Sequence, residues 1–247
     1  MATEHTVKSY DEELKNLNQI IAQMGGLAEA QLQTAIEALV RRDSDLASQA
    51  VQSDARIDAL EQQISSLTVR ILALRQPMAS DLREVVAALK ISSDLERIGD
   101  YAANVGKRAI ALSHTPPVKL VSAIPRMSRL VQQIIKDVLD AYIEHDADKA
   151  LDVWQRDEEV DEMYTSLFRE LLTYMMEDPR NISPCTHLLF IAKNIERIGD
   201  HATNIAEIVH FLVLGRPIEA IRPKGDTTSF ALVSPPEDTA KTAGPAR

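Results

Sequence analysis

A charged segment of the sequence occurs twice, and its two copies lie one hundred positions apart. Residues 94–104 read DLERIGDYAAN, and residues 194–204 read NIERIGDHATN. Both copies contain the same Glu, Arg, Ile, Gly, Asp, Ala and Asn residues, so the duplication has kept charged positions as well as apolar ones. Such a repeat predicts two related halves that share a polar role.

The composition favours long helices. Only 4% of the 247 residues are aromatic, whereas Ala, Leu, Ile, Glu, Asp and Gln are plentiful. This mixture suits helices and offers little with which a β-sheet could pack. Because the chain is long enough for two small domains, we expect an all-α fold of two tandem three-helix bundles related by internal duplication.

Apolar residues at helical spacing predict three long helices in the first half, at 10–41, 46–76 and 81–112. Capping boxes are expected at Ser9–Glu12 and Asp81–Glu84, and the polar turn 42–45 is expected to cap the second helix. The pair Gly25-Gly26 inside the first helix is interpreted as tolerated surface variation. In the second half, Ser183-Pro184 is expected to start the last helix, which should end near Gly215.

Two domains followed by a tail are predicted from these helices and the turns between them. The first bundle covers residues 8–114 and the second covers 117–215, with the boundary in the Pro-containing turn 113–117. The remaining tail, 216–247, holds five of the eleven prolines and has no amphipathic period. We therefore expect the tail to be disordered, at least beyond about residue 223.

Each half carries two pairs of carboxylates whose members stand four residues apart, so both members lie on one helix face. On the third helix the pair continues the stripe of Leu82, Val85, Val86 and Leu89, opposite Leu95, Ile98, Ala102 and Val105. We expect the pairs on the second and third helices to face each other, with Asn104 and Asn204 as additional oxygen donors. The candidate metal ligands are Asp54, Asp58, Glu96 and Asp100 in the first half, and Asp157, Asp161, Glu196 and Asp200 in the second.

Oxygen ligands of this kind suit hard or borderline cations such as Mg²⁺, Mn²⁺, Ca²⁺ or iron. Zinc stays among the candidates, although the scarcity of Cys and His excludes a structural site of the finger type. The alternative is that these pairs belong to solvated helix faces and are neutralised by arginines such as Arg97 and Arg197. The duplication of all the pairs favours the metal hypothesis, and these two arginines are then interpreted as ion-pair partners.

Nothing in the sequence indicates catalysis. The step Glu207–His210 has the Glu-x-x-His spacing of di-iron sites, but such sites need a second copy of this step on another helix, and the chain has none. His201 stands where the first half has Tyr101, so we interpret it as a flanking residue. The lone Cys185 is interpreted as inert core, and no Ser-His-Asp arrangement or phosphate-binding glycine loop occurs.

The formal net charge of −10 disfavours nucleic acid and anionic lipid as partners over most of the surface. No apolar run approaches the roughly 20 residues that a membrane-spanning helix needs, so direct membrane insertion is not expected. The single cysteine and the polar start of the chain predict a cytoplasmic location.

The repeated [LI]ERIGD motif, the two Asp-x-x-[IV]-Asp steps and the segment 77–83 (PMASDLR) together resemble the PhoU family over about residues 10–216. The resemblance implies two three-helix bundles, often dimeric, with metal clusters on the acidic motifs, which map onto the eight carboxylates named above. It implies a cytoplasmic regulator that limits phosphate uptake and damps phosphate-starvation signalling. The implied partners are the ATPase subunit of a phosphate ABC transporter and a sensor histidine kinase. The tail after Arg216 is longer than the family core needs.

Three functions therefore compete at the level of the sequence. A regulatory adaptor would bind metal without turnover. A di-metal carboxylate enzyme would consume oxygen, and a metal-free structural bundle would use the carboxylates only as a charged surface.

Overall fold

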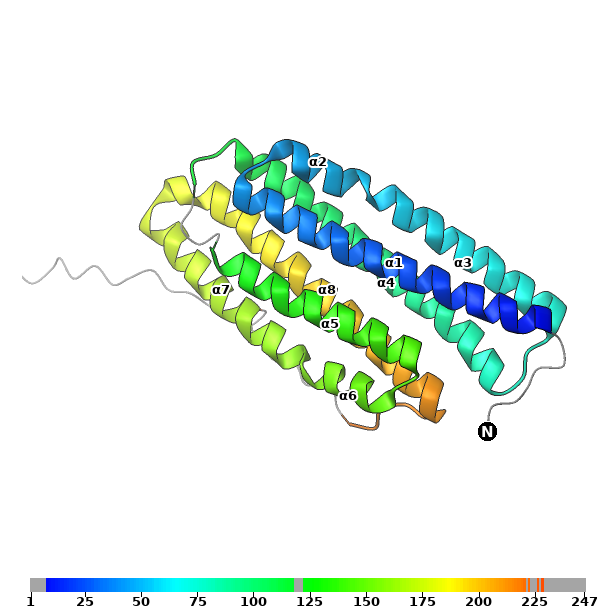
Figure 1. Ribbon diagram of the computed structural model, residues 1–247. Helices are drawn as coiled ribbons and strands as arrows, with labels where there is room; N and C mark the ends of the chain where they lie inside the picture. The colour runs from blue at the N-terminus through cyan, green and yellow to red at the C-terminus, as the bar shows by residue number, and fades with distance from the viewer. Residues whose placement is uncertain (1–7, 118–121, 221, 223–225, 227, 229–247) are drawn as a thin grey trace, which may run out of the picture.

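The protein is described here by a computed structural model that covers residues 8–117, 122–220, 222, 226 and 228. Within these residues the chain forms helices and turns and no strand, so the predicted all-α fold is confirmed (Figure 1). The first half contains α1 (Lys8–Arg41), α2 (Ser44–Gln52), α3 (Asp54–Arg75) and α4 (Ser80–Ser113). The second half contains α5 (Ile124–Glu144), α6 (Ala147–Gln155), α7 (Asp157–Glu177), the short 3₁₀ turn η2 (Pro179–Asn181) and α8 (Ile182–Leu214).

Each half is a bundle of three helical rods. The middle rod consists of two consecutive helices, α2 and α3 or α6 and α7, where the sequence predicted a single helix. Ser53 separates α2 from α3, and Arg156 separates α6 from α7. These two residues occupy equivalent positions of the repeat, so the break itself is duplicated. It places Asp54 and Asp157 in the first turn of a new helix, where the positive end of the helix dipole favours a carboxylate.

The prediction that a residue of the 42–45 turn caps the second helix is confirmed. Asp43 accepts hydrogen bonds from the backbone N–H groups of Asp45 and Leu46, at 3.0 and 2.9 Å. Asp146 caps α6 in the same way. A cap of this type typically contributes about 1 kcal/mol.

The other predicted helix starts are wrong by one or two residues. α1 begins at Lys8, so Ser9 lies inside the helix, where its hydroxyl accepts a hydrogen bond from Arg75. α4 begins at Ser80 without a side-chain cap, and α8 begins at Ile182, directly after η2. The predicted end of α8 is confirmed, because Gly215 adopts a left-handed conformation (φ 69°) after the last helical residue.

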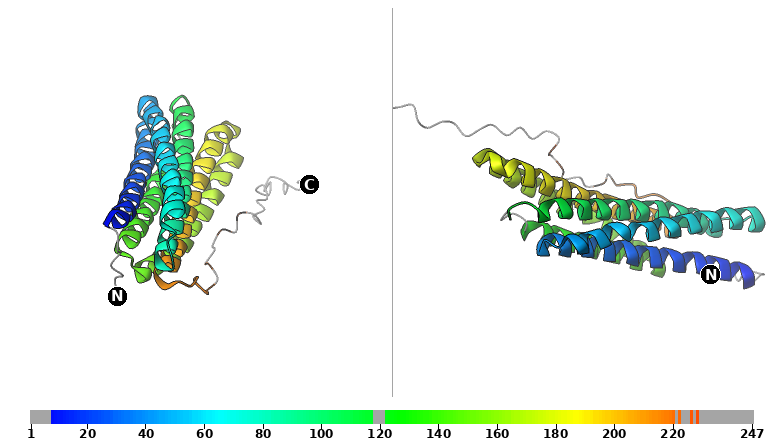
Figure 2. Two further views of the ribbon diagram at one scale, coloured as in Figure 1. Left: turned by 90° about the vertical axis from the view of Figure 1, so that its right-hand side faces the viewer. Right: turned by 90° about the horizontal axis from the view of Figure 1, so that it is seen from above.

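The two bundles lie side by side, with α4 and α8 packed against each other at the centre (Figure 2). Polar side chains join the bundles at one end of this contact. The Tyr142 hydroxyl on α5 donates to Asn18 on α1, and the Asn18 amide donates to Glu84 on α4, 2.8 Å away. Tyr142 is buried and Asn18 and Glu84 are half-buried, so this network ties the first bundle to the second at the edge of the core.

The interpretation of Gly25-Gly26 as surface variation is correct for Gly26 and wrong for Gly25. Nothing lies within 4 Å of a Cβ added at Gly26. A Cβ at Gly25 would lie 2.5 Å from Leu139 Cδ1, because α1 approaches α5 closely at this point. Gly25 is buried, so the glycine allows the two bundles to pack together here.

The side of α4 that carries Glu96 and Asp100 is less buried than its opposite side. Leu95, Ile98, Ala102 and Val105, on the opposite side, are fully buried. Of the apolar residues that precede the acidic pair, Val85 is buried, whereas Leu82, Val86 and Leu89 are 41%, 38% and 36% exposed. The acidic stripe therefore continues a largely exposed apolar stripe.

Among the described residues, no helix is long and apolar enough to span a bilayer.

The two glycines of α1 offer a matched test of the contact between the bundles. We expect Gly26→Ala to raise the free energy of unfolding by about 0.5–1 kcal/mol, because alanine is the better helix former. Gly25→Ala gains the same propensity but overpacks against Leu139, a cost of roughly 1–3 kcal/mol, so it should be the less stable variant. Urea unfolding of both variants measures the difference, and equal stabilisation would contradict a close approach at Gly25.

Candidate functional site

The first carboxylate cluster comprises Asp54 and Asp58 on α3 with Glu96 and Asp100 on α4. Asp54 accepts a hydrogen bond from the Gln31 amide on α1, at 3.2 Å. Burial raises the pKa of Asp54; the Gln31 hydrogen bond opposes this effect, and the charges of Asp58 and Asp100 add to it. The carboxylates of the two helices are thus close enough to repel one another.

Among the described residues, the positive charge that contacts this cluster directly comes from Arg97, on the same helix as Glu96 and Asp100. Arg97 Nη1 lies 3.3 Å from Asp100, and Nε lies 3.5 Å from Glu96, which confirms Arg97 as an ion-pair partner. The Arg97 side chain is 57% exposed, so solvent weakens both contacts. Burial, followed by the charge of Asp100, still raises the pKa of Glu96. The first cluster remains accessible and only partly compensated.

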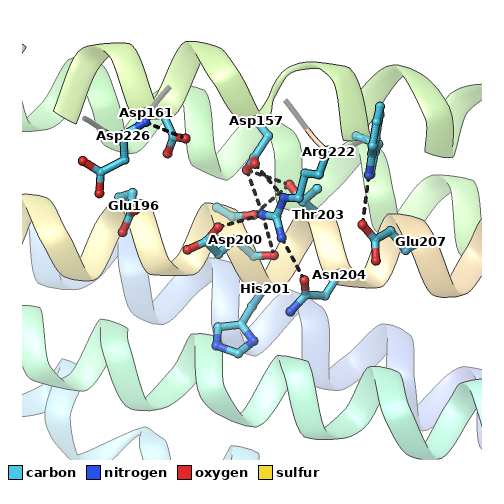
Figure 3. A network of polar contacts seen from close by, with 12 residues as sticks. Asp157, Asp161, Glu196, Asp200, His201, Thr203, Asn204, Glu207, Arg222 and Asp226 are labelled. Carbon is cyan, nitrogen blue, oxygen red and sulfur yellow. Dashed lines mark hydrogen bonds and ion pairs between the residues drawn. The ribbon is translucent and has the colours of Figure 1, made fainter. Parts of the chain in front are cut away.

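The second carboxylate cluster comprises Asp157 and Asp161 on α7 with Glu196 and Asp200 on α8 (Figure 3). It is more deeply buried than the first: Asp157, Asp161 and Glu196 are only 2%, 4% and 4% exposed. The Thr203 hydroxyl, itself buried, donates to Asp157 at 3.0 Å. The first half has Ala103 in place of Thr203, and the second half has Ile134 in place of Gln31, so the two clusters differ in their neutral neighbours.

Arg222, from the segment after α8, lies among the carboxylates of the second cluster (Figure 3). Its guanidinium donates to both oxygens of Asp157, at 2.8 and 3.1 Å, and to Asp200 Oδ1, at 2.7 Å. It also donates to the Asn204 carbonyl oxygen, at 3.1 Å. The sequence had placed Arg222 in a tail of unassigned role, and its two-oxygen contact with Asp157 is a strong form of carboxylate recognition.

A second set of contacts covers the other end of this cluster. The backbone N–H of Asp226 donates to Asp161 Oδ2, at 3.2 Å. The Lys193 ammonium donates to Glu196, at 2.7 Å, and to Asp226, at 2.9 Å. Every carboxylate of the second cluster is therefore contacted by Arg222, by Asp226 or by Lys193.

Glu196 is the member of the second cluster whose ionisation is most strongly perturbed. Burial raises the pKa of Glu196 to about 7, although the Lys193 ammonium acts in the opposite direction. One carboxylate oxygen, Oε2, is buried and has no hydrogen-bond partner among the residues that the structure describes. A buried acceptor in this state costs free energy that a proton or a bound cation can recover.

His201 lies outside the carboxylate cluster, as its interpretation as a flanking residue predicted, whereas the two asparagines that were expected to add oxygen donors are engaged elsewhere. His201 Nδ1 lies 2.7 Å from Asp94 on α4, so the histidine connects the two bundles, as expected of a flanking residue. The carbonyl oxygen of Asn104 accepts from Lys107, and that of Asn204 accepts from Arg222. Both oxygens are thus already engaged.

The residues considered for catalysis are also engaged elsewhere. Glu207 accepts a hydrogen bond from the Trp154 indole N–H, at 3.0 Å, and His210 Nδ1 lies 3.2 Å from the Arg216 carbonyl oxygen. Cys185 is fully buried, and burial raises the pKa of its thiol. Arg197 was interpreted from the sequence as an ion-pair partner, like Arg97. In the structure it lies over the Tyr101 ring, with 5.6 Å between the guanidinium carbon and the ring centroid.

The carboxylates fit a hard cation in their chemistry, and the second cluster also offers the unpartnered Glu196 Oε2. Within the described part of the chain, however, no group of three or more His, Cys, Asp or Glu side chains is arranged to hold an ion as the structure stands. The first cluster would have to draw its two pairs together around an ion. The second would in addition have to give up its contacts with Arg222.

Arg222 and Asp226 are the residues of this site that the sequence analysis missed. They lie outside the repeat and follow a segment without helical periodicity, so no spacing rule connects them with carboxylates on α7 and α8. Both residues lie in the tail 216–247 that was expected to be disordered, at least beyond about residue 223, and residues 221, 223–225, 227 and 229–247 of that tail lie outside the described residues. The role of Lys193 had a weak signal in the sequence, because this lysine stands where the first half has Ser93 in an otherwise similar repeat.

Comparison with known proteins gives a consistent family. The model of the PhoU domain matches residues 21–109 and 124–209. The phosphate-specific transport system accessory protein PhoU homolog of Caulobacter vibrioides is 58% identical over 92% of this chain and 99% of its own length. The homolog from Rhizobium meliloti is 50% identical over 93% and 97% of the two chains.

Two solved structures have the same fold. The crystal structure of PhoU from Pseudomonas aeruginosa matches with a TM-score of 0.81 and 44% identity, covering 84% of this chain and 100% of that one. The phosphate transport system regulatory protein PhoU from Streptococcus pneumoniae matches with a TM-score of 0.79 and 31% identity, covering 85% and 100%.

The raised pKa of Glu196 predicts a pH dependence of stability in protein freed of metal by a chelator. Between the unfolded value, about 4.3, and the folded value, about 7, the folded state binds more protons, so stability falls as pH rises through this window. Glu196→Gln should flatten this slope in unfolding experiments between pH 5 and 8. Glu159→Gln, which alters an exposed carboxylate on α7, is the control, and identical slopes in parent and Glu196→Gln would contradict the assignment.

Proposed function

The chain belongs to the PhoU family, and on that premise we propose that it is a negative regulator of phosphate uptake and of phosphate-starvation signalling. Its relatives are phosphate-specific transport system accessory proteins, which supports a role in phosphate transport regulation. The protein acts without turnover, as a cytoplasmic adaptor between the ATPase subunit of a phosphate ABC transporter and a sensor histidine kinase. It works as a homodimer.

The observation that carries the metal-dependent part of this proposal is the presence of two carboxylate clusters at equivalent positions of the repeat. Asp54, Asp58, Glu96 and Asp100 hold cations in the first half, and Asp157, Asp161, Glu196 and Asp200 do so in the second. A divalent or iron cation would supply positive charge between α3 and α4, and between α7 and α8. The protein's own contribution is to hold these helices at a fixed separation and to present the resulting surface to a partner.

The metal-dependent adaptor function can be tested with two matched double variants. Asp100→Asn/Asp200→Asn removes one charge from each cluster without changing side-chain shape. Asp45→Asn/Asp148→Asn removes the same charge from two exposed, equivalent positions in the first turns of α2 and α6. We expect elemental analysis to find metal in the parent and the control, and a loss of at least about tenfold in metal affinity in the cluster variant.

The same variants connect metal with regulation. In cells, the cluster variant should release the transporter ATPase or the kinase in pull-down experiments, and should raise phosphate uptake when phosphate is plentiful. Metal loss without either effect would separate the clusters from regulation. Unchanged metal content in the cluster variant would contradict the assignment of the carboxylates as ligands.

A further inference from the structure

The two carboxylate clusters repeat the same acidic residues but differ in their positive partners. The first is contacted by Arg97, which is 57% exposed and lies at 3.3 and 3.5 Å from its partners. The second is contacted by Arg222 and Lys193, which are 18% and 31% exposed and lie at 2.7 to 2.8 Å. Shorter contacts in a more buried setting are less screened by water, so the second cluster is the better compensated of the two.

The positively charged guanidinium of Arg222 lies between carboxylates of two helices, α7 and α8. It contacts Asp157 on α7 and Asp200 on α8 at the same time, and it also donates to the backbone carbonyl of Asp200. An ion that bridged the two carboxylates would compete with Arg222 for both oxygens of Asp157 and for Oδ1 of Asp200, and it would be repelled by the guanidinium charge.

The segment after α8 has no equivalent in the first half. The chain that leaves α4 at Ser113 enters α5 at Ile124, whereas the chain that leaves α8 at Leu214 does not enter another helix among its described residues. Asp226 adds a further contact, because its backbone N–H binds Asp161 and its carboxylate binds Lys193. Removing Arg222 from the cluster would therefore also affect the contacts of Asp226.

We propose that Arg222 is the internal cation of the second carboxylate cluster, so that the two clusters bind metal unequally. The first cluster takes up an external divalent cation directly. The second takes one up only when Arg222, together with Asp226, has been displaced from Asp157, Asp161 and Asp200. Arg222 is thus a specificity-determining residue for the metal sites, and this inference rests on the metal-binding part of the proposed function.

Titration of the full-length protein with Mn²⁺ alone tests the competition. In an Asp100→Asn background, which weakens the first cluster, binding reports mainly on the second. Adding Arg222→Met removes the guanidinium charge and keeps a long side chain, and should raise the Mn²⁺ affinity by at least about tenfold. Arg216→Met, which alters an exposed arginine outside the cluster, is the control and should leave the affinity unchanged.

Hydrogen–deuterium exchange of the unmodified chain tests displacement without any variant. The Asp226 amide is hydrogen-bonded to Asp161, so it should exchange slowly in metal-free protein and faster once Mn²⁺ saturates the second cluster. Unchanged exchange at saturation would overturn the inference. So would equal Mn²⁺ affinity of the second cluster with and without Arg222→Met.

These results separate failure of the inference from failure of the proposed function. If the parent binds Mn²⁺ and loses affinity in Asp100→Asn/Asp200→Asn, the metal-binding role stands whatever Arg222→Met does. If neither cluster binds Mn²⁺ in any variant, the metal-binding role and the inference are both overturned.

Discussion

Carboxylates that are held close together on neighbouring helices repel one another unless positive charge lies between them, and this constraint governs both halves of the protein. The duplicated break in the middle rod bears on this constraint. By starting a new helix at Asp54 and at Asp157, the chain places the first carboxylate of each cluster at the positive end of a helix dipole. The helix dipole does not offset the burial of Asp54, because the pKa of Asp54 is still raised, and burial also raises the pKa of Glu196 within α8. Further positive charge is needed, and the two halves supply it differently.

The helices that carry the repeated motif also join the bundles. α4 and α8 pack against each other, and the contact between His201 and Asp94 lies beside the second cluster, because His201 directly follows Asp200. Asn204 binds Asp94 on one side and Arg222 on the other. A change in the position of Arg222 would therefore act on a residue that also contacts the first bundle. The motif thus links the charge state of the second cluster to the packing of the two bundles.

Much of the fold follows from the sequence, because long amphipathic patterns and an internal repeat are strong signals. The Asp43 and Asp146 caps and the end of α8 at Gly215 have local causes that a sequence can reveal. The breaks at Ser53 and Arg156 do not, since neither residue is a glycine or a proline and both remain close to helical geometry. The packing of Gly25 against Leu139 depends on how the bundles meet, and the contact of Arg222 with Asp157 joins residues 65 positions apart. Neither has a periodicity from which it could be predicted.

The identical carboxylates of the two halves do not make identical sites, because a binding site is defined by its neighbours as well as by its ligands. Gln31 supports Asp54 where Thr203 supports Asp157, and Lys193 stands where the first half has Ser93. A cation that enters the second cluster must exchange places with a guanidinium, so its apparent affinity includes the free energy of releasing the segment that carries Arg222. Coupling of this kind is reciprocal. A partner that bound the released segment would raise the metal affinity of the second cluster by a certain factor, and bound metal would raise the affinity for that partner by the same factor. If both clusters bind cations as proposed, two unequal sites in one chain would allow cation binding and partner binding to regulate each other, which two equal and independent sites would not.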